Sequence, residues 1–289
     1  MKATIYTLGL LLIAGLATGC DNISEDNRYI KVEKPVYENP QTLLVMEFTG
    51  NRCINCPTGA SIIEQIKEDE GEDKVITVGL HPKGNNYTNP MVAQYPERHL
   101  QDFRSDAATA LYGYYNPSGF PAAVFNGLNM SSSTTNWMAL ASTALQTSAK
   151  MSIDANCDYD SELQELKVNY KVKFGNTISD KLNLTVWLVE NNILGSQYMP
   201  DGSTNDEYVH NHVLRTSLNG DWGETIANGN PGESVDSETP AVEGSASISL
   251  KDKDWKPENC EVVVYVYRDS DKGVEQATKA PVISAQATD

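Results

Sequence analysis

Apolar positions divide the chain into two parts that follow different periods. From residue 40 to residue 150, short apolar runs alternate with segments in which apolar side chains recur at helical spacing. This alternation of strands and helices is typical of an α/β unit. The predicted strands cover residues 42–46, 73–80 and 122–125, and the predicted helices cover residues 58–66, 103–115 and 134–150.

After residue 150 the period changes to that of strands. Short alternating segments are separated by Gly, Asn, Asp and Ser, which predicts an antiparallel β-sandwich. The predicted strands cover residues 166–174, 182–189, 209–218, 245–250 and 262–267, and the polar segment 219–244 is predicted to be a long surface loop. We therefore expect an α/β domain over residues 40–150 and an all-β, immunoglobulin-like sandwich over residues 151–289.

The N-terminal segment has the pattern of a lipoprotein signal peptide over residues 1–19. Lys2 precedes an apolar stretch at residues 5–16 that is too short to span a bilayer as a mature helix. The stretch leads into Leu-Ala-Thr-Gly-Cys, and the small residues before Cys20 resemble a bacterial lipobox. Cys20 is therefore expected to carry the lipid that anchors the protein to a membrane. An ordinary secretion signal with a chance cysteine is the alternative.

The net negative charge of the chain argues against one class of partner, nucleic acids. The chain holds 22 Lys and Arg against 39 Asp and Glu, a net charge of −17. A phosphate backbone would be repelled, so nucleic acid is not an expected partner. No ATP, nucleotide or haem motif occurs, and no cofactor is expected. Residues 20–39 begin with a polar, acidic run and are predicted to form a flexible tether.

Two cysteines at C-x-x-C spacing, Cys53 and Cys56, lie between a predicted strand and a predicted helix. The free N–H groups at a helix start favour a thiolate and lower the pKa of the first cysteine. A pair at this spacing can close a disulfide and reopen it. The same pair could also be half of a metal site, or a static disulfide on a fold without activity.

The residues around this pair resemble the thioredoxin fold. Glu47 lies six residues before Cys53, where thioredoxins carry a buried acid, and Gly-Phe-Pro at residues 119–121 precedes a strand and an Asn-Gly turn. The resemblance implies that Pro121 is a cis-proline facing the disulfide. It also implies that Phe120 presents its backbone to an extended partner peptide.

The resemblance assigns a role to each catalytic candidate. Cys53 would be the attacking thiolate and the more exposed thiol, and Cys56 the resolving thiol. A buried Glu47 would have a raised pKa and could take the proton of Cys56. Arg52 replaces the tryptophan common before the first cysteine, and its charge could favour the thiolate. Ile-Asn replaces the Gly-Pro dipeptide, so the redox direction stays open.

Two further pairs of residues are candidates for local chemistry. Cys157 and Cys260 each lie near a predicted strand, and in an oxidising envelope they are expected to pair as a structural disulfide. The alternative is two buried free cysteines that act as small apolar groups. His210 and His212 share one face of a predicted strand. A metal pair needs a third ligand, so the favoured interpretation is two polar side chains on the solvent face.

The whole plan is similar to the Omp28 family of Bacteroidetes outer-membrane lipoproteins. The shared features are the lipobox, Glu-Phe-Thr-Gly-x-x-Cys-x-x-Cys-Pro, Gly-Phe-Pro and His-Asn-His-Val-Leu-Arg. The resemblance implies a lipid-anchored, surface-exposed protein with an adhesin or receptor role. Two functions are therefore expected. One is a thiol–disulfide oxidoreductase acting on envelope or secreted proteins through Cys53 and Cys56, and the other is a non-catalytic surface lipoprotein that binds partners through its β-sandwich.

Overall fold

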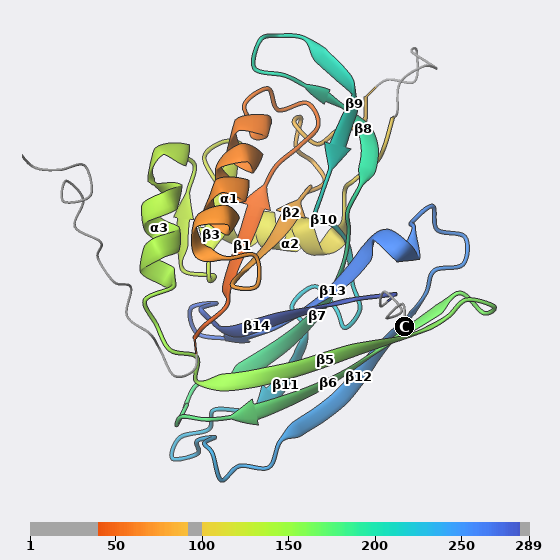
Figure 1. The fold of residues 1–289 in the computed structure, drawn as a ribbon. Helices are drawn as coiled ribbons and strands as arrows, with labels where there is room; N and C mark the ends of the chain where they lie inside the picture. Colours follow the sequence, from red (N-terminus) through yellow and green to blue (C-terminus); the bar gives the residue numbers. More distant parts are fainter. Residues whose placement is uncertain (1–39, 92–99, 284–289) are drawn as a thin grey trace, which may run out of the picture. The chain divides into compact units, whose positions relative to one another are not determined.

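A mixed sheet of nine strands runs through residues 40–91 and 100–283, the residues that this computed structural model describes (Figure 1). Its strands are β1 (Leu43–Phe48), β2 (Val75–Leu80), β3 (Ala122–Phe125), β4 (Asn129–Ser131), β7 (Leu182–Glu190), β10 (Val213–Ser217), β11 (Glu224–Ala227), β13 (Cys260–Arg268) and β14 (Val274–Pro281). Their order is β14-β13-β7-β10-β2-β1-β3-β4, and β11 pairs with β7. The signal peptide, Cys20 and the tether predicted over residues 1–39 lie outside the described residues.

Helices and two smaller sheets surround these strands. The helices are α1 (Cys56–Glu70), α2 (Asp106–Tyr115) and α3 (Trp137–Ala144), with short 3-10 turns η2 (Thr134–Asn136) and η3 (Pro257–Asn259). The smaller sheets are β12-β6-β5, built from β5 (Met151–Asp160), β6 (Glu165–Phe174) and β12 (Val242–Ser249), and the hairpin of β8 (Ile193–Tyr198) and β9 (Thr204–His210). No helix within the described ranges is long and apolar enough to cross a membrane.

Strand β1 shows how alternating side chains create two cores. Its even-numbered residues pack on the face covered by α2, and its apolar odd-numbered residues pack on the opposite face with α1 and α3 (Figure 1). Glu47 belongs to the odd-numbered set, two residues after Val45. Its carboxyl group is therefore placed beneath α1 by the period of the strand.

Strand β10 joins the two halves of the chain into one sheet. Val213 pairs in parallel with Gly79 of β2, and the Gly79 N–H donates to the His212 carbonyl oxygen at 2.7 Å. On its other side, β10 pairs antiparallel with β7, which in turn pairs with β13. The fold is thus mixed α/β with a large sheet and few helices. The domain boundary at residue 150 stays a prediction.

A third core lies between the β12-β6-β5 sheet and the strands β7 and β13. Every residue of β7 is buried, because one face of this strand meets the third core and the other face meets the core under α2. A strand covered on both faces reads as a continuous apolar run rather than an alternating one. This explains why the segment 182–189 is so rich in Leu and Val.

Three expectations about the elements differ from the structure. The segment 209–218, predicted as one strand, is divided between β9 and β10, because His212 adopts a left-handed backbone (φ 58°) that ends one strand and begins the next. The helix predicted over residues 134–150 is η2 followed by α3, which ends at Ala144. The segment 219–244 is not entirely a loop, since β11 pairs with β7.

The disulfide predicted between Cys157 and Cys260 is not formed, and both residues are free cysteines. Cys157 lies on β5 and Cys260 begins β13, and both pack into the third core. Burial raises the pKa of Cys157 to about 11 and that of Cys260 to about 12, so both stay protonated at neutral pH. They act there as small apolar side chains, which is the alternative that the sequence left open.

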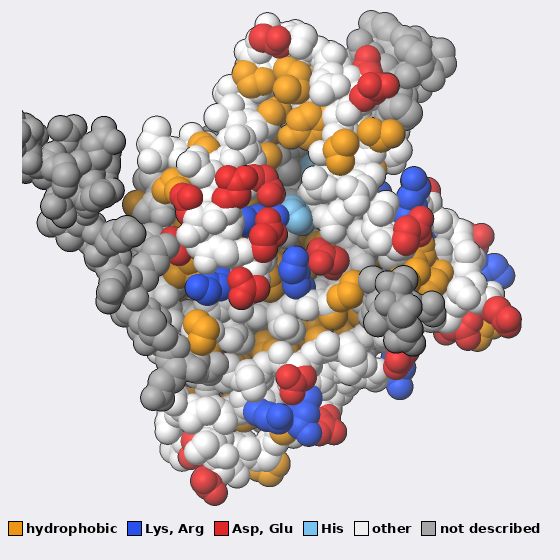
Figure 2. Space-filling view, in the orientation of Figure 1, with side chains coloured by type: hydrophobic (Ala, Val, Ile, Leu, Met, Phe, Trp, Pro, Cys, Tyr) orange, Lys and Arg blue, Asp and Glu red, His pale blue; other side chains and the backbone are white. Residues whose placement is uncertain are grey.

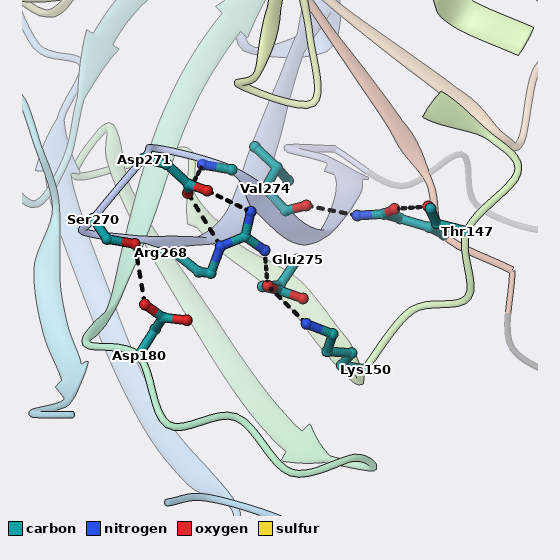
Figure 3. Close-up of polar contacts among 10 residues, drawn as sticks. Thr147, Lys150, Asp180, Arg268, Ser270, Asp271, Val274 and Glu275 are labelled. Carbon is teal, nitrogen blue, oxygen red and sulfur yellow. Dashed lines mark hydrogen bonds and ion pairs between the residues drawn. The ribbon is translucent and has the colours of Figure 1, made fainter. Parts of the chain in front are cut away.

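A polar cluster ties the β13–β14 hairpin to the chain just before β5 (Figure 3). Arg268 donates one hydrogen bond to Glu275, and its other terminal nitrogen lies 3.0 Å from Asp271. Lys150 Nζ lies 3.4 Å from the same Glu275 carboxylate. Because Glu275 is only 4% exposed, its charge is stabilised by these two cations rather than by water.

We expect Glu275→Ala to lower the free energy of unfolding by about 2 kcal/mol, since it removes the buried acceptor shared by Arg268 and Lys150. Urea unfolding followed by circular dichroism measures the change. Glu243→Ala is the matched control, because its ion pair with Lys171 is exposed and should leave the unfolding midpoint unchanged. Equal unfolding midpoints for the two variants would contradict the stabilising role of Glu275.

Candidate redox site

Cys53 and Cys56 form a disulfide at the start of helix α1, with their Cα atoms 5.4 Å apart. Pro57 follows in the first turn of the helix, where its missing N–H breaks no helical hydrogen bond. Cys53 is 1% exposed and Cys56 is 2% exposed. The expectation that Cys53 is the more exposed of the two is therefore wrong for this oxidised form. Ile54 between them is 47% exposed.

The turn formed by residues 50–53 is held on one side by the loop that follows β2. The Arg52 N–H donates to the Tyr87 carbonyl oxygen at 2.9 Å, and Arg52 Nη2 donates to the Pro90 carbonyl oxygen at 2.7 Å. A Cβ atom on Gly50 would lie 2.3 Å from the Tyr87 oxygen, so this position requires glycine. The Arg52 guanidinium thus serves to anchor the loop.

The β8–β9 hairpin holds the 50–53 turn on the other side. Gln197 Nε2 donates to the Cys53 carbonyl oxygen at 3.0 Å and to the Gly50 carbonyl oxygen at 3.3 Å. The neighbouring Tyr198 N–H donates to the Asn51 carbonyl oxygen at 2.9 Å. Sequence reasoning missed Gln197, because it lies 144 residues from Cys53 and belongs to no motif.

Glu47 and Pro121 meet helix α1 at Gly59, one turn after the disulfide. A Cβ atom on Gly59 would lie 2.9 Å from Glu47 Oε1 and 3.0 Å from Pro121 Cβ. The absence of a side chain at Gly59 therefore lets both residues approach the helix. The Phe120–Pro121 peptide bond is cis, which confirms the isomer expected from the resemblance.

Glu47 is a buried carboxyl group with few partners. It is 5% exposed, and its Oε1 has no hydrogen-bond partner in the described part of the chain. Burial, followed by the negative charge of Glu64, raises the pKa of Glu47 to about 8. The group is therefore protonated at pH 7 and ionises just above it, which suits a residue that exchanges protons near neutral pH.

A cavity of about 270 Å³ lies beside Glu47 and Cys56. Helix α1 forms one wall, Thr77 and Gly79 of β2 form the floor, and Gln197 with the segment 208–213 forms the opposite wall. Thr77 and Gly79 face the cavity for the same reason as Glu47, since alternate residues of a strand share a face. The cavity therefore combines residues from both halves of the chain.

The histidines of the second half lie at this cavity and not on a solvent face. His210 is buried and His212 is half-buried, so the favoured interpretation from sequence was wrong. The ring of Phe103 lies 4.6 Å from the His210 ring and 5.2 Å from the His81 ring. Burial lowers the pKa of His210 to about 4 and that of His81 to about 3. Both rings are therefore neutral at physiological pH.

His212 lines the cavity and contacts helix α1. Its Nε2 lies 3.6 Å from Glu64 Oε1 and 3.4 Å from Lys67 Nζ, and Lys67 also bonds Glu64 at 3.1 Å. The bond to His212, and then the contacts with Lys67, lower the pKa of Glu64 to about 2. Acidic and basic side chains gather over this region in Figure 2. Glu64 is thus a permanent negative charge near Glu47.

An aromatic cluster lies beside the cis-proline. The Phe120 ring stacks on the Tyr87 ring at 5.5 Å and packs against Phe48 at 6.1 Å. Tyr87 is 43% exposed. Among the described residues, no group of three or more His, Cys, Asp or Glu side chains is arranged to hold a metal ion.

Comparison with known proteins identifies a family and a similar solved structure. A family model described as outer membrane protein Omp28 matches residues 108–286. The solved structure of HBP35 of Porphyromonas gingivalis is similar at a TM-score of 0.60 and 16% identity, covering 88% of this chain and 80% of that chain, which supports the mixed α/β fold.

A crystal structure of a domain of the outer membrane lipoprotein Omp28 from Porphyromonas gingivalis is 24% identical, with a TM-score of 0.32, over 46% of this chain and 88% of that chain. No protein with a curated description matches. Because the Omp28 model covers more than half of the residues, this chain belongs to the Omp28 family of outer membrane proteins and is a protein of the cell envelope.

Proposed function

We propose that this chain is a lipid-anchored thiol–disulfide oxidoreductase exposed on the cell surface. In this proposal, residues 40–150 are a thioredoxin-like domain that carries the Cys53–Cys56 pair, and residues 151–289 are an immunoglobulin-like domain. Cys20 carries the lipid. The substrates are thiols or disulfides of envelope or secreted proteins.

One observation carries the proposal. A disulfide opens helix α1, and the cis-proline Pro121 and the buried acid Glu47 both contact that helix at Gly59, one turn further on. A static disulfide requires neither a buried carboxyl group with a pKa of about 8 nor a cavity beside the second cysteine. Thiol exchange uses both, because a thiol must lose its proton before it can attack.

The reaction consists of two exchange steps. In the reduced protein, the Cys53 thiolate attacks a substrate disulfide, forms a mixed disulfide and releases one substrate thiolate. Cys56 then loses its proton to ionised Glu47 and attacks the Cys53 sulfur, which releases the second substrate thiolate. Two electrons pass to the substrate, and the protein is left with the Cys53–Cys56 disulfide seen here. The reverse sequence oxidises a substrate dithiol.

We expect the Cys53–Cys56 pair to have a reduction potential of roughly −120 to −270 mV, the range of exchange catalysts. Equilibration with glutathione buffers and mass-spectrometric trapping measures it. Cys53→Ser should abolish insulin reduction, and the matched control Cys157→Ser should not. A potential below about −300 mV would mark a structural bridge and remove the basis of the proposal.

Glu47→Gln should slow disulfide exchange about a hundredfold at pH 8, because Cys56 loses its proton acceptor. The wild-type rate should rise through pH 8, where Glu47 ionises, and the variant should lack this rise. Glu68→Gln, on the exposed side of α1, is the control.

The same variant has a second readout in stability. The pKa of Glu47 is raised on folding, so the stability it contributes is present below pH 4.5 and is lost as the pH rises through 8. Glu47→Gln should therefore be more stable than the wild type at pH 9, by about 4 kcal/mol. Parallel pH profiles of unfolding for the two proteins would contradict the buried position of the charge.

A second candidate function is supported by the burial of the two sulfurs. With exposures of 1% and 2%, Cys53 and Cys56 could form a static bridge in a surface protein that binds partners through its β-domain. In that case the connection between β11 and β12, which includes the exposed residues 230–234, is the candidate binding segment.

If this second function holds, replacing residues 230–234 by Gly and Ser should weaken binding of the purified protein to cells at least tenfold and leave its fold intact. Flow cytometry with labelled protein measures binding, and circular dichroism measures the fold. Replacing the exposed residues 161–163 at the β5–β6 turn is the matched control. Unchanged cell binding of the 230–234 variant would rule out partner binding through this segment.

A further inference from the structure

The hairpin of the second half of the chain takes part in the redox site. We propose that Gln197 is a positioning residue of the Cys53–Cys56 pair, whose side-chain amide holds the 50–53 turn in the conformation in which the two sulfurs join. This inference rests on the proposed function. It adds a residue outside the C-x-x-C motif and outside the α/β half of the chain.

The two bonds of Gln197 fall on the two carbonyl groups that define the turn. The Gly50 carbonyl oxygen also accepts from the Cys53 N–H at 3.0 Å, and the Cys53 carbonyl oxygen also accepts from the Cys56 N–H at 3.3 Å. Gln197 Nε2 reaches both oxygens, at 3.3 Å and 3.0 Å. It therefore links the two carbonyl oxygens that also accept the backbone hydrogen bonds of the turn.

A bulge in the hairpin aims Gln197 at the turn. The register of β8 against β9 shifts between Gly195, which pairs with Tyr208, and Gln197, which pairs with Asn205. A bulge changes the direction in which the following side chain points. Gln197 is 3% exposed, so its amide is held by protein partners and not by water. Nε2 also lies 3.0 Å from the Tyr198 carbonyl oxygen, so its two hydrogens are shared among three acceptors.

Aromatic rings pack against strand β8 of the hairpin at Gly195. A Cβ atom on Gly195 would lie 3.0 Å from Nε2 of the His210 ring and 3.0 Å from the Phe103 ring, so the two rings pack directly on the β8 backbone. The Tyr198 N–H adds its bond to Asn51 on the side of the turn. Contacts that do not include the two sulfurs therefore hold the β8 backbone beside Gln197.

This arrangement acts on the equilibrium between dithiol and disulfide. In the disulfide, the S–S bond holds the turn whether or not Gln197 is present. In the dithiol, only hydrogen bonds hold it, and losing the Gln197 bonds lets the two thiols move apart. Their effective concentration then falls, and the disulfide is less favoured. The equilibrium has two sides. On one side are the dithiol form of Cys53 and Cys56 and one molecule of oxidised glutathione. On the other side are the Cys53–Cys56 disulfide and two molecules of reduced glutathione.

The test compares Gln197→Met with the wild type in glutathione redox buffers at pH 7, with the full mature chain. Methionine keeps the volume of glutamine and has no N–H donor. We expect the equilibrium constant for disulfide formation to fall about fivefold, a potential about 20 mV more positive. Glu207→Gln, an exposed position on β9 of the same hairpin, should leave the constant unchanged.

A second variant keeps the test decisive if Gln197→Met does not fold. Protonated glutamic acid can donate one hydrogen bond to a carbonyl oxygen, and ionised glutamate cannot. Burial of position 197 should raise the pKa of the introduced carboxyl group and keep it protonated at pH 5. Relative to the wild type at the same pH, Gln197→Glu should therefore match closely at pH 5 and fall at least fivefold once the carboxyl group is ionised, at pH 8 or above. A constant within twofold of the wild type at both pH values, or an equal shift in Glu207→Gln, would overturn the positioning role.

The two proposals fail separately. A wild-type potential below about −300 mV would remove the proposed oxidoreductase function. The comparison between variants would still be measurable in dithiothreitol buffers, and a fivefold loss in Gln197→Met would then assign Gln197 to the stability of a structural bridge. A normal wild-type potential with no variant effect would retain the function and reject Gln197.

Discussion

The pairing of β10 with β2 is the interaction on which the rest of this structure depends. One N–H donated by Gly79 to the His212 carbonyl oxygen extends the sheet of the first half into the second half. It also sets His210, His212 and the β8–β9 hairpin beside helix α1, where they wall the cavity next to Cys56. Without this pairing, the cavity beside Glu47 would lack its lining from residues 208–213, and Gln197 would have no turn to bind.

Exclusion of water then determines the electrostatics of the site. Glu47 is placed beneath α1 by the alternation of β1, and the walls from the second half remove the water that would stabilise its charge. Glu64 is kept ionised by His212 and Lys67, so its charge adds to the effect of burial rather than being neutralised by a proton. A residue from each half of the chain therefore contributes to the protonation state of one carboxyl group.

The sequence predicted the local features of the site better than its long-range ones. The strand before the cysteines and the helix after them follow from the period of apolar residues, which is local. The cis-proline and the buried Glu47 are implied by the resemblance to the thioredoxin fold, whose motifs lie within about 75 residues of one another. The surroundings of His210 and His212 and the contacts of Gln197 depend on pairing across more than a hundred residues, which no local pattern encodes. The same limit explains the error at Cys157 and Cys260, since nearness to strands does not fix the distance between two thiols.

The distribution of charge along α1 bears on which role the disulfide has. The chain carries a net charge of −17, and acidic side chains close to a cysteine disfavour its thiolate. Yet the first turn of α1, which begins at Cys56, contains no acidic residue, and the acids of this helix are placed from Glu64 onward, toward its C-terminal end. Acidic groups at that end oppose the helix dipole and weaken the helix by a few tenths of a kcal/mol each. Helix stability alone would favour the reverse order, so the arrangement fits a requirement to keep the positive end of the helix free for a cysteine thiolate.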